Sequence, residues 1–252
     1  MTNSLVEVGQ GQIVTVYPVA GGNGASYTAM NLAYAMREKD PYASIAVVDF
    51  DFTNPYMGIA LTTDNVHGID NLVDKINGDF LDDEQFKENM IVLKDDVHLL
   101  KGSQLGHFDL VKQDHLTIMV DYLKTLYDVT FIATNFSASD IGTPVGLYVA
   151  DQILLLGRYT SANAVLSQRA VETIRNYAGH GEVSILYNMY HNQNGIDFSE
   201  VFEGWPVLGT IPYVGDTVDN DHLSGKSLGG LVKRRNPSEE VYQEVLETII
   251  KE

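Results

Sequence analysis

Residues 16–28 of the chain have the sequence VYPVAGGNGASYT. They follow a predicted buried strand at Ile13–Tyr17 and lead into a predicted helix at Ser26–Glu38. The glycine-rich turn Gly21–Gly24 allows positive φ angles, which point several backbone N–H groups toward one place, and the start of a helix adds a partial positive charge. Two interpretations are open: a loop that binds a phosphate group, or a tight connection whose glycines are required by sterics alone.

Short β-rich runs alternate with amphipathic segments along the chain. The helix after the glycine-rich turn has one apolar face, with Ala29, Leu32, Ala33 and Met36 at helical spacing. Such alternation predicts an α/β, three-layer fold, with a mostly parallel twisted sheet flanked by helices on both faces. Further strands are expected at Ser44–Phe50, Val97–Leu100, Val129–Ala133, Gln152–Leu156, Val183–Tyr187 and Val207–Ile211. Further helices are expected at His115–Leu126, Ala162–Tyr177, Asp219–Lys226 and Ser238–Lys251, with a helix or loop at Leu81–Glu88.

The chain of 252 residues has no internal repeat and no linker rich in proline, glycine or serine. This length is usual for one large sheet packed between helices, so residues 1–252 are expected to form a single domain. Near the C-terminal end, Val241, Val245, Leu246 and Ile249 lie at helical spacing, opposite an acidic face. We expect this helix to pack on the body of the domain, because a membrane-surface helix would carry Lys and Arg instead.

Acidic residues outnumber basic ones by 34 to 16, which gives a formal net charge of −18. Such a surface repels phosphate backbones over about 10 Å, so bulk DNA binding is not expected. The compact basic cluster Lys233-Arg234-Arg235 is either a local contact patch or ordinary solvated surface. The chain has no cysteine, and its seven histidines show no metal-ligand spacing. No apolar run reaches the ~20 residues of a membrane span, and Met1–Gln12 lacks the pattern of a secretory signal, so a cytoplasmic location is expected.

The ordered series of motifs resembles the MinD/ParA family of P-loop ATPases. Ala20–Ser26 is similar to the family's deviant Walker A loop, Lys-Gly-Gly-x-Gly-Lys-Ser/Thr. Val47–Phe52 resembles its second-strand motif with paired aspartates. The resemblance continues in the same order through Tyr127–Ile132, the approach to the Walker B strand, and then through Ala150–Leu155, Leu186–Asn188 and Val207–Pro212.

The resemblance implies a site for ATP or ADP with magnesium. Asp51 matches the residue that orients the attacking water, while Ser26 and Asp49 match positions at the magnesium ion. Asn188 and Pro212 match positions that contact or border the base. The two aspartates also have a simpler interpretation, as strand-end carboxylates that cap the following loop. The loop residues that match the phosphate site are Gly21, Gly22, Asn23, Gly24, Ala25, Ser26 and Tyr27.

Three charged positions of the family are occupied here by alanine. The signature lysine falls at Ala20, the Walker A lysine at Ala25 and the Walker B aspartate at Ala133. Loss of groups that stabilise charge in phosphoryl transfer lowers rates by orders of magnitude, so a degenerate pseudo-ATPase is expected. The triplet Gly24-Ala25-Ser26 also resembles the TadZ/CpaE branch, whose members position pilus and secretion machinery at the cell pole.

Two functions stay open at this point. The first is a homodimeric, nucleotide-responsive factor that positions or assembles protein components of a pilus, secretion or conjugation system. A protein partner would recruit it to the cell pole or the membrane. The second is a slow but active Mg-ATPase in partitioning or cell-pole localisation, which would use Asp51 and a cation such as Lys226 or Arg158 across a dimer.

Overall fold

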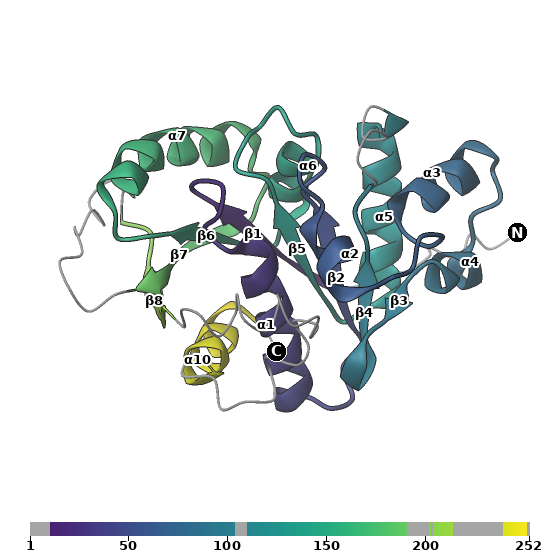
Figure 1. Ribbon diagram of the computed structural model, residues 1–252, viewed down its shortest axis with the longest axis horizontal. Helices are drawn as coiled ribbons and strands as arrows, with labels where there is room; N and C mark the ends of the chain where they lie inside the picture. The colour runs from purple at the N-terminus through teal and green to yellow at the C-terminus, as the bar shows by residue number, and fades with distance from the viewer. Residues whose placement is uncertain (1–10, 104–109, 191–201, 203, 214–238, 251–252) are drawn as a thin grey trace, which may run out of the picture.

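The computed structural model describes residues 11–103, 110–190, 202, 204–213 and 239–250. Within them, eight strands form one sheet in the order β3-β4-β2-β5-β1-β6-β7-β8 (Figure 1). Every neighbouring pair is parallel except β3 with β4. The strands are β1 (Gln12–Pro18), β2 (Ile45–Phe50), β3 (Ile91–Val92), β4 (Val97–Leu100), β5 (Val129–Thr134), β6 (Gln152–Gly157), β7 (Glu182–Tyr190) and β8 (Val207–Pro212).

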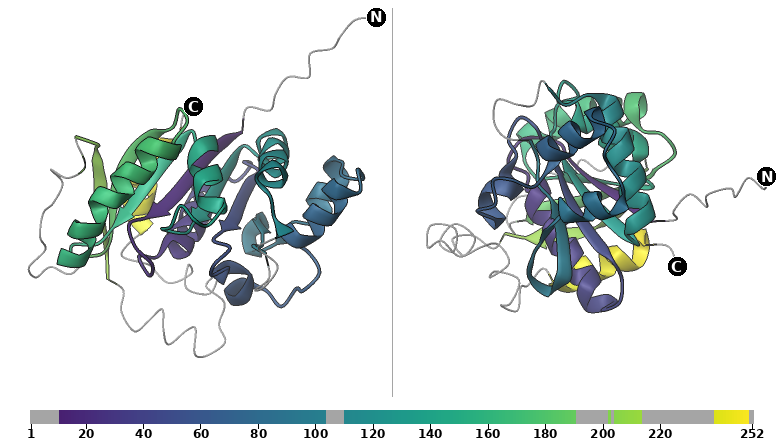
Figure 2. Two further views of the ribbon diagram at one scale, coloured as in Figure 1. Left: turned by 90° about the horizontal axis from the view of Figure 1, so that it is seen from above. Right: turned by 90° about the vertical axis from the view of Figure 1, so that its right-hand side faces the viewer.

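Helices cover both faces of this sheet. Helices α1 and α10 lie on one face, and α5, α6 and α7 lie on the other (Figures 1 and 2). The expected three-layer α/β fold is therefore confirmed. The helices are α1 (Ala25–Lys39), α2 (Tyr56–Leu61), α3 (Ile69–Asn77), α4 (Asp83–Glu88), α5 (Gln113–Leu126), α6 (Gly142–Val149), α7 (Ser161–Tyr177) and α10 (Glu239–Ile249).

The central strands are buried on both faces, as expected for a parallel sheet covered by helices. Every residue of β2, β5 and β6 is buried. The apolar face predicted for α1 packs on this sheet, and Ala29, Leu32 and Ala33 are each 0% exposed. Because these residues are mostly small, the helix approaches the strands closely and brings its N-terminus to their carboxyl edge.

The C-terminal helix α10 packs against α1 and β8, as expected from its apolar face. Val245 and Leu246 are 0% exposed and join the same core cluster as α1. Hydrogen bonds add to this contact, because Gln243 Nε2 donates to Ala35 O at 3.0 Å. Among the described helices, none is long and apolar enough to cross a membrane.

Five elements were not anticipated: α2, α3, α6, the short strand β3 and the 3-10 helix at Lys94–Asp96. Helix α6 contains Gly142, Pro144 and Gly146, which have low helix propensity, so tertiary contacts decide its conformation. Gly142 is required there because a Cβ atom would collide with the carbonyl oxygen of Phe50. The predicted helix at Asp219–Lys226 and the basic cluster at residues 233–235 lie outside the described residues.

Candidate functional site

The glycine-rich loop connects the end of β1 to the start of α1. Strand β1 lies between β5 and β6, so the loop emerges at the carboxyl edge of the sheet's centre. Gly22 has φ 77° and Gly24 has φ 88°, both in the left-handed region that glycine tolerates best. At Gly24 a Cβ atom would also lie 2.5 Å from Asn188 Nδ2. The loop therefore needs glycine for its turn, and it presents its N–H groups at a helix N-terminus.

A pocket of about 390 Å³ surrounds this loop. The loop and the first turn of α1 form one wall, and the segments that follow β2 and β5 form the other walls. It contains Asp51 and the predicted loop residues from Gly21 to Tyr27, so most of the predicted site is brought together. Its lining residues are Pro18, Gly21, Gly22, Asn23, Gly24, Ala25, Ser26, Tyr27, Asp51, Thr53, Asn54, Tyr56, Thr134, Asn135 and Phe136.

Asp51 is the acidic group of this pocket. Its Oδ1 accepts hydrogen bonds from Asn135 Nδ2 and from Asn54 N, both at 2.8 Å. Burial raises the pKa of Asp51, and the bond from Asn135 partly opposes that shift. The carboxylate is thus held in place by the segments after β2 and β5, where it faces the loop.

Asp49 lies only two residues earlier, yet it does not line the pocket. It is 0% exposed, and its Oδ2 accepts a 2.8 Å hydrogen bond from Met57 N at the start of α2. Oδ1 accepts from Asp51 N at 3.3 Å. Burial raises the pKa of Asp49 to about 8. These contacts match the simpler interpretation, in which the carboxyl caps the following loop.

Asp140 is a third carboxylate at this edge, and no sequence signal pointed to it. It is 6% exposed, and its Oδ2 accepts from both the backbone N and the Oγ1 of Thr53 at 2.8 Å. Oδ1 accepts from Gly142 N at 3.1 Å. Because Thr53 lines the pocket, Asp140 fixes one wall of it from the segment just before α6. Asp140 and Thr53 are 87 positions apart in the sequence, so no local motif could reveal their hydrogen bonds.

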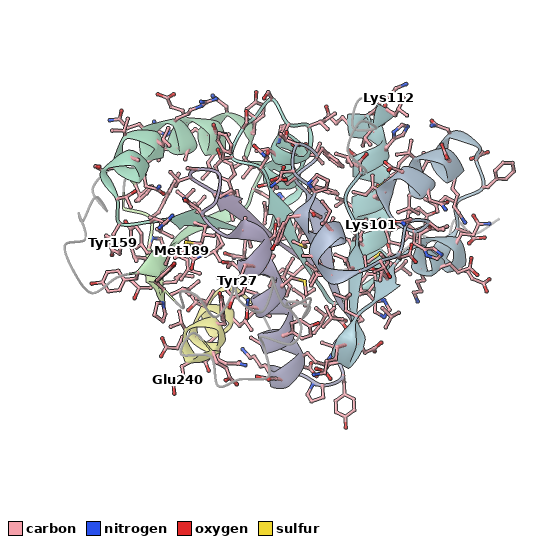
Figure 3. All side chains as sticks on the ribbon, in the orientation of Figure 1. Tyr27, Lys101, Lys112, Tyr159, Met189 and Glu240 are labelled. Atoms are coloured by element: carbon pink, nitrogen blue, oxygen red, sulfur yellow. The ribbon has the colours of Figure 1, made fainter. Side chains whose placement is uncertain are left out.

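The predicted base-contacting residues lie outside the pocket. Asn188 is 3% exposed, its Nδ2 donates to Asn23 O at 2.8 Å, and its Oδ1 accepts from Met189 N at 2.8 Å. Its amide therefore braces the loop from β7. Pro212 ends β8 and pairs with Tyr190. Figure 3 shows Met189 at the end of β7 close to the N-terminal turn of α1, where Tyr27 lies.

The charge of the pocket is unusual for a phosphate site. None of the described residues that line it is Lys or Arg. Ala25 forms part of the wall, and Ala133 is 0% exposed, paired with Val16 on β1 and with Asp49 on β2. With Asp51 present and no described cation, the pocket is less favourable for an anion than a site that includes a lysine.

The donor set of the pocket fits a nucleotide with magnesium. Magnesium in phosphate sites is usually held by one or two protein oxygen ligands together with phosphate oxygens and water. Ser26 and Asp51 both line the pocket, and the Ser26 hydroxyl has no hydrogen bond to another described residue. Asp49 does not contribute in this conformation, because both of its oxygens face backbone N–H groups.

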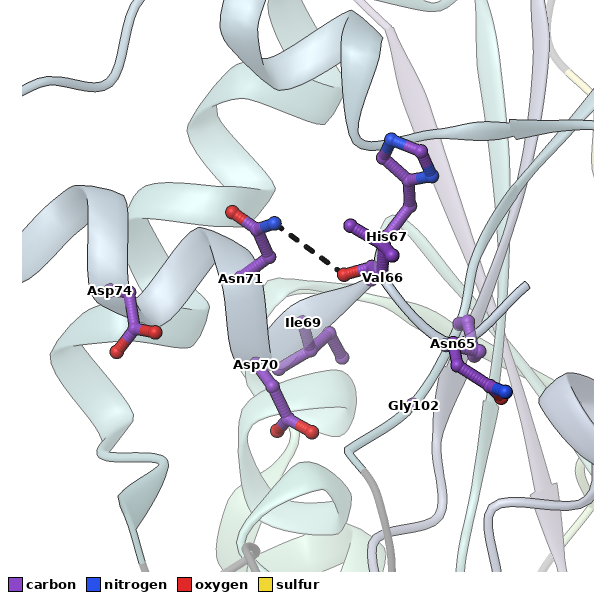
Figure 4. A pocket seen from close by; sticks show the side chains of 10 residues that line it. Asn65, Val66, His67, Ile69, Asp70, Asn71, Asp74 and Gly102 are labelled. Carbon is purple, nitrogen blue, oxygen red and sulfur yellow. Dashed lines mark hydrogen bonds between the residues drawn. The ribbon is translucent and has the colours of Figure 1, made fainter.

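A second pocket, of about 310 Å³, lies at the N-terminus of α3 (Figure 4). Asn71 Nδ2 donates to Val66 O at 3.4 Å along its rim. Lys101 also lines this pocket; it is 7% exposed and donates from Nζ to Asp64 O at 2.6 Å. None of the residues predicted from the sequence lies in this pocket.

Comparisons with known proteins add the following. The sequence matches no protein-family model, and no curated protein matches it. The structure superimposes on a ParA family ATPase from Chlorobium tepidum with a TM-score of 0.79, 15% identity, and coverage of 94% of this chain and 98% of the other. It superimposes on MinD in a MinC:MinD cell division complex from Aquifex aeolicus with a TM-score of 0.71, 12% identity, and coverage of 96% and 97%. For a septum site-determining MinD with Mg-ADP from Pyrococcus horikoshii, the TM-score is 0.70, the identity 15%, and the coverage 95% and 96%. Similarities at this level of identity establish the architecture, and the chain thus has the fold of the ParA and MinD ATPases.

Proposed function

We propose that this protein is a nucleotide-responsive positioning or assembly factor, a pseudo-ATPase that binds ATP or ADP with magnesium weakly. The observation that carries the proposal is the pocket at the β1–α1 junction. It keeps the glycine loop and the helix N-terminus, but none of its described lining residues is a Lys or Arg. Such a site holds phosphate through backbone N–H groups while lacking the cations that accelerate transfer.

Each part of the pocket has a defined role in this proposal. The N–H groups of Gly21, Gly22 and Gly24–Ser26 bind the phosphates, while Asn23 N donates to Ala20 O within the turn. Ser26 and Asp51 offer oxygen atoms for the metal. Magnesium, when bound with the nucleotide, neutralises phosphate charge. Because Ala20, Ala25 and Ala133 supply no charge, affinity is low and hydrolysis is slow or absent.

The structural neighbours support a role in spatial organisation. A MinD with this fold is known with Mg-ADP, and another forms a complex with the cell division protein MinC. By analogy, this protein forms a homodimer and recruits protein components of a larger machine, such as a pilus, secretion or conjugation system. In this proposal it acts in the cytoplasm, and a protein partner brings it to the cell pole or membrane.

Calorimetry with Mg-ATP and Mg-ADP, combined with a phosphate-release assay, tests this function. We expect weak binding and negligible turnover. Asp51→Ala should leave turnover unchanged at that negligible level, and Asp121→Ala, the same charge change at an exposed position of α5, serves as the control. Substantial magnesium-dependent turnover that disappears in Asp51→Ala and persists in Asp121→Ala would overturn the proposal.

A slow but active Mg-ATPase is the second candidate function. It is favoured by Asp51, which lines the pocket and has a raised pKa because it is partly buried. The slow ATPase requires magnesium-dependent turnover that disappears in Asp51→Ala and persists in Asp121→Ala, which is the result that contradicts the pseudo-ATPase. A protein that binds neither nucleotide in calorimetry would exclude both.

A further inference from the structure

Asn23 belongs to the glycine-rich loop, and its side chain is 1% exposed. Its Nδ2 donates to Leu156 O at 3.1 Å and to Asn163 Oδ1 at 2.7 Å. The same Asn163 oxygen accepts from Arg158 N at 3.0 Å. One buried amide therefore connects the loop to the end of β6 and to the first turn of α7.

The backbone of Asn23 is held from a third direction. Its carbonyl oxygen accepts the 2.8 Å hydrogen bond from Asn188 Nδ2, which comes from β7. The next residue, Gly24, leaves the space in which this amide lies. Contacts from β6, α7 and β7 thus converge on the middle of the loop.

A loop of this composition needs external contacts to stay in one conformation, because glycine loses more conformational freedom on ordering than any other residue. We propose that Asn23 is the positioning residue of the site: its buried amide holds Gly21–Ser26 in the phosphate-binding conformation and so sets the nucleotide affinity. This inference rests on the proposed function. The apparent affinity falls in proportion to the fraction of molecules whose loop is in the competent conformation.

The donor and acceptor roles of the Asn23 and Asn163 side chains predict different effects of aspartate at the two positions, which packing alone would not. Asn23 Nδ2 faces two acceptors, so Asn23→Asp places carboxylate oxygens against Leu156 O and Asn163 Oδ1. Asn163 Oδ1 instead accepts from two donors, so Asn163→Asp keeps both bonds, and a negative charge in the first turn of α7 is compatible with the helix dipole. Asn and Asp have nearly the same size, so packing alone would treat the two sites alike.

The experiment measures Mg-ADP affinity by calorimetry and amide hydrogen exchange of residues 21–26 in the nucleotide-free protein. We expect Asn23→Asp and Asn163→Leu to weaken binding by about tenfold or more and to speed exchange in the loop. Asn163→Asp should keep both properties near those of the wild type. Asn176→Leu, at an exposed asparagine of the same helix, is the control for the leucine substitution.

The inference would be overturned if Asn23→Asp and Asn163→Asp changed Mg-ADP affinity and loop exchange equally. Unchanged amide exchange of the loop in Asn23→Asp would also overturn it. If the wild type binds no Mg-ADP, the proposed function fails and the exchange pattern alone decides. Faster loop exchange in Asn23→Asp and Asn163→Leu, with wild-type exchange in Asn163→Asp, then still supports Asn23 as the residue that fixes the loop.

Discussion

Adding a cation to the pocket should strengthen nucleotide binding, and Ala25→Lys is the direct way to do so. Ala25 begins α1, is 8% exposed and lines the pocket. Two opposite charges 4 Å apart interact by about 4 kcal/mol at an effective dielectric constant near 20. Desolvation and ordering of the side chain reduce this gain, and hydrogen bonds to charged groups contribute about 1.5–3 kcal/mol net.

That range corresponds to between about tenfold and about a hundredfold tighter binding of Mg-ADP, measured by calorimetry. Ala162→Lys adds the same charge at an exposed position of α7 and should leave the affinity unchanged within about twofold. An Ala25→Lys protein that keeps its fold by circular dichroism yet binds no more tightly than the wild type would refute the argument. In that case the pocket would not place a phosphate beside the first turn of α1.

Three further predictions concern the framework of the site. Gly22→Ala should destabilise the protein by about 1 kcal/mol through positive φ alone, whereas Gly24→Ala also displaces Asn188 and should cost more in urea unfolding; equal losses would contradict this. Burial raises the pKa of Asp49 in the folded state to about 8, so the folded protein keeps a proton that the unfolded chain releases above about pH 4. The free energy of unfolding should therefore fall from pH 4 to pH 8. This contribution is at most about 6 kcal/mol, and Asp49→Asn should flatten the profile; an unchanged slope would exclude the raised pKa. Leu246 on α10 is fully buried in the core cluster that includes α1, so Leu246→Ala should lower the free energy of unfolding by about 2–5 kcal/mol. A loss below about 1 kcal/mol would argue against that packing.

Local sequence signals were sufficient for the strand–loop–helix unit and for most of the sheet. The run from Ile13 to Tyr17 is short, apolar and followed by glycines, and this combination leaves little alternative to a buried strand and a tight turn. The same reasoning located β2, β5 and β6, which are apolar because both of their faces are covered. Helix α6 was missed because Gly142 and Pro144 disfavour a helix locally, and its contacts with the sheet, α5 and α7 compensate.

The roles of individual polar residues depended on contacts that the sequence does not display. Asp49 and Asp51 belong to one motif, but Asp49 turns toward Met57 N because α2 begins there, and α2 itself was not predicted. A contact of Asn188 with the base stays a prediction, and the structure adds a role that the motif did not indicate: its amide donates to Asn23 O across 165 positions of sequence. Partners this far apart in the chain become visible only after the strands are placed side by side.

The aspartates at this edge of the sheet have a structural role that a lysine in the glycine-rich loop would not have. Asp49, Asp51 and Asp140 each accept at least one backbone N–H group from the segment between β2 and α2. A lysine at Ala20 or Ala25 would instead act mainly on a bound phosphate, so its absence leaves this segment intact. The presence of the carboxylates is therefore explained by the folding of the pocket wall, without hydrolysis. It follows that Asp49, Asp51 and Asp140 are by themselves no sign of hydrolysis, and that adding a cation, as in Ala25→Lys, is the sharper test of what the pocket binds.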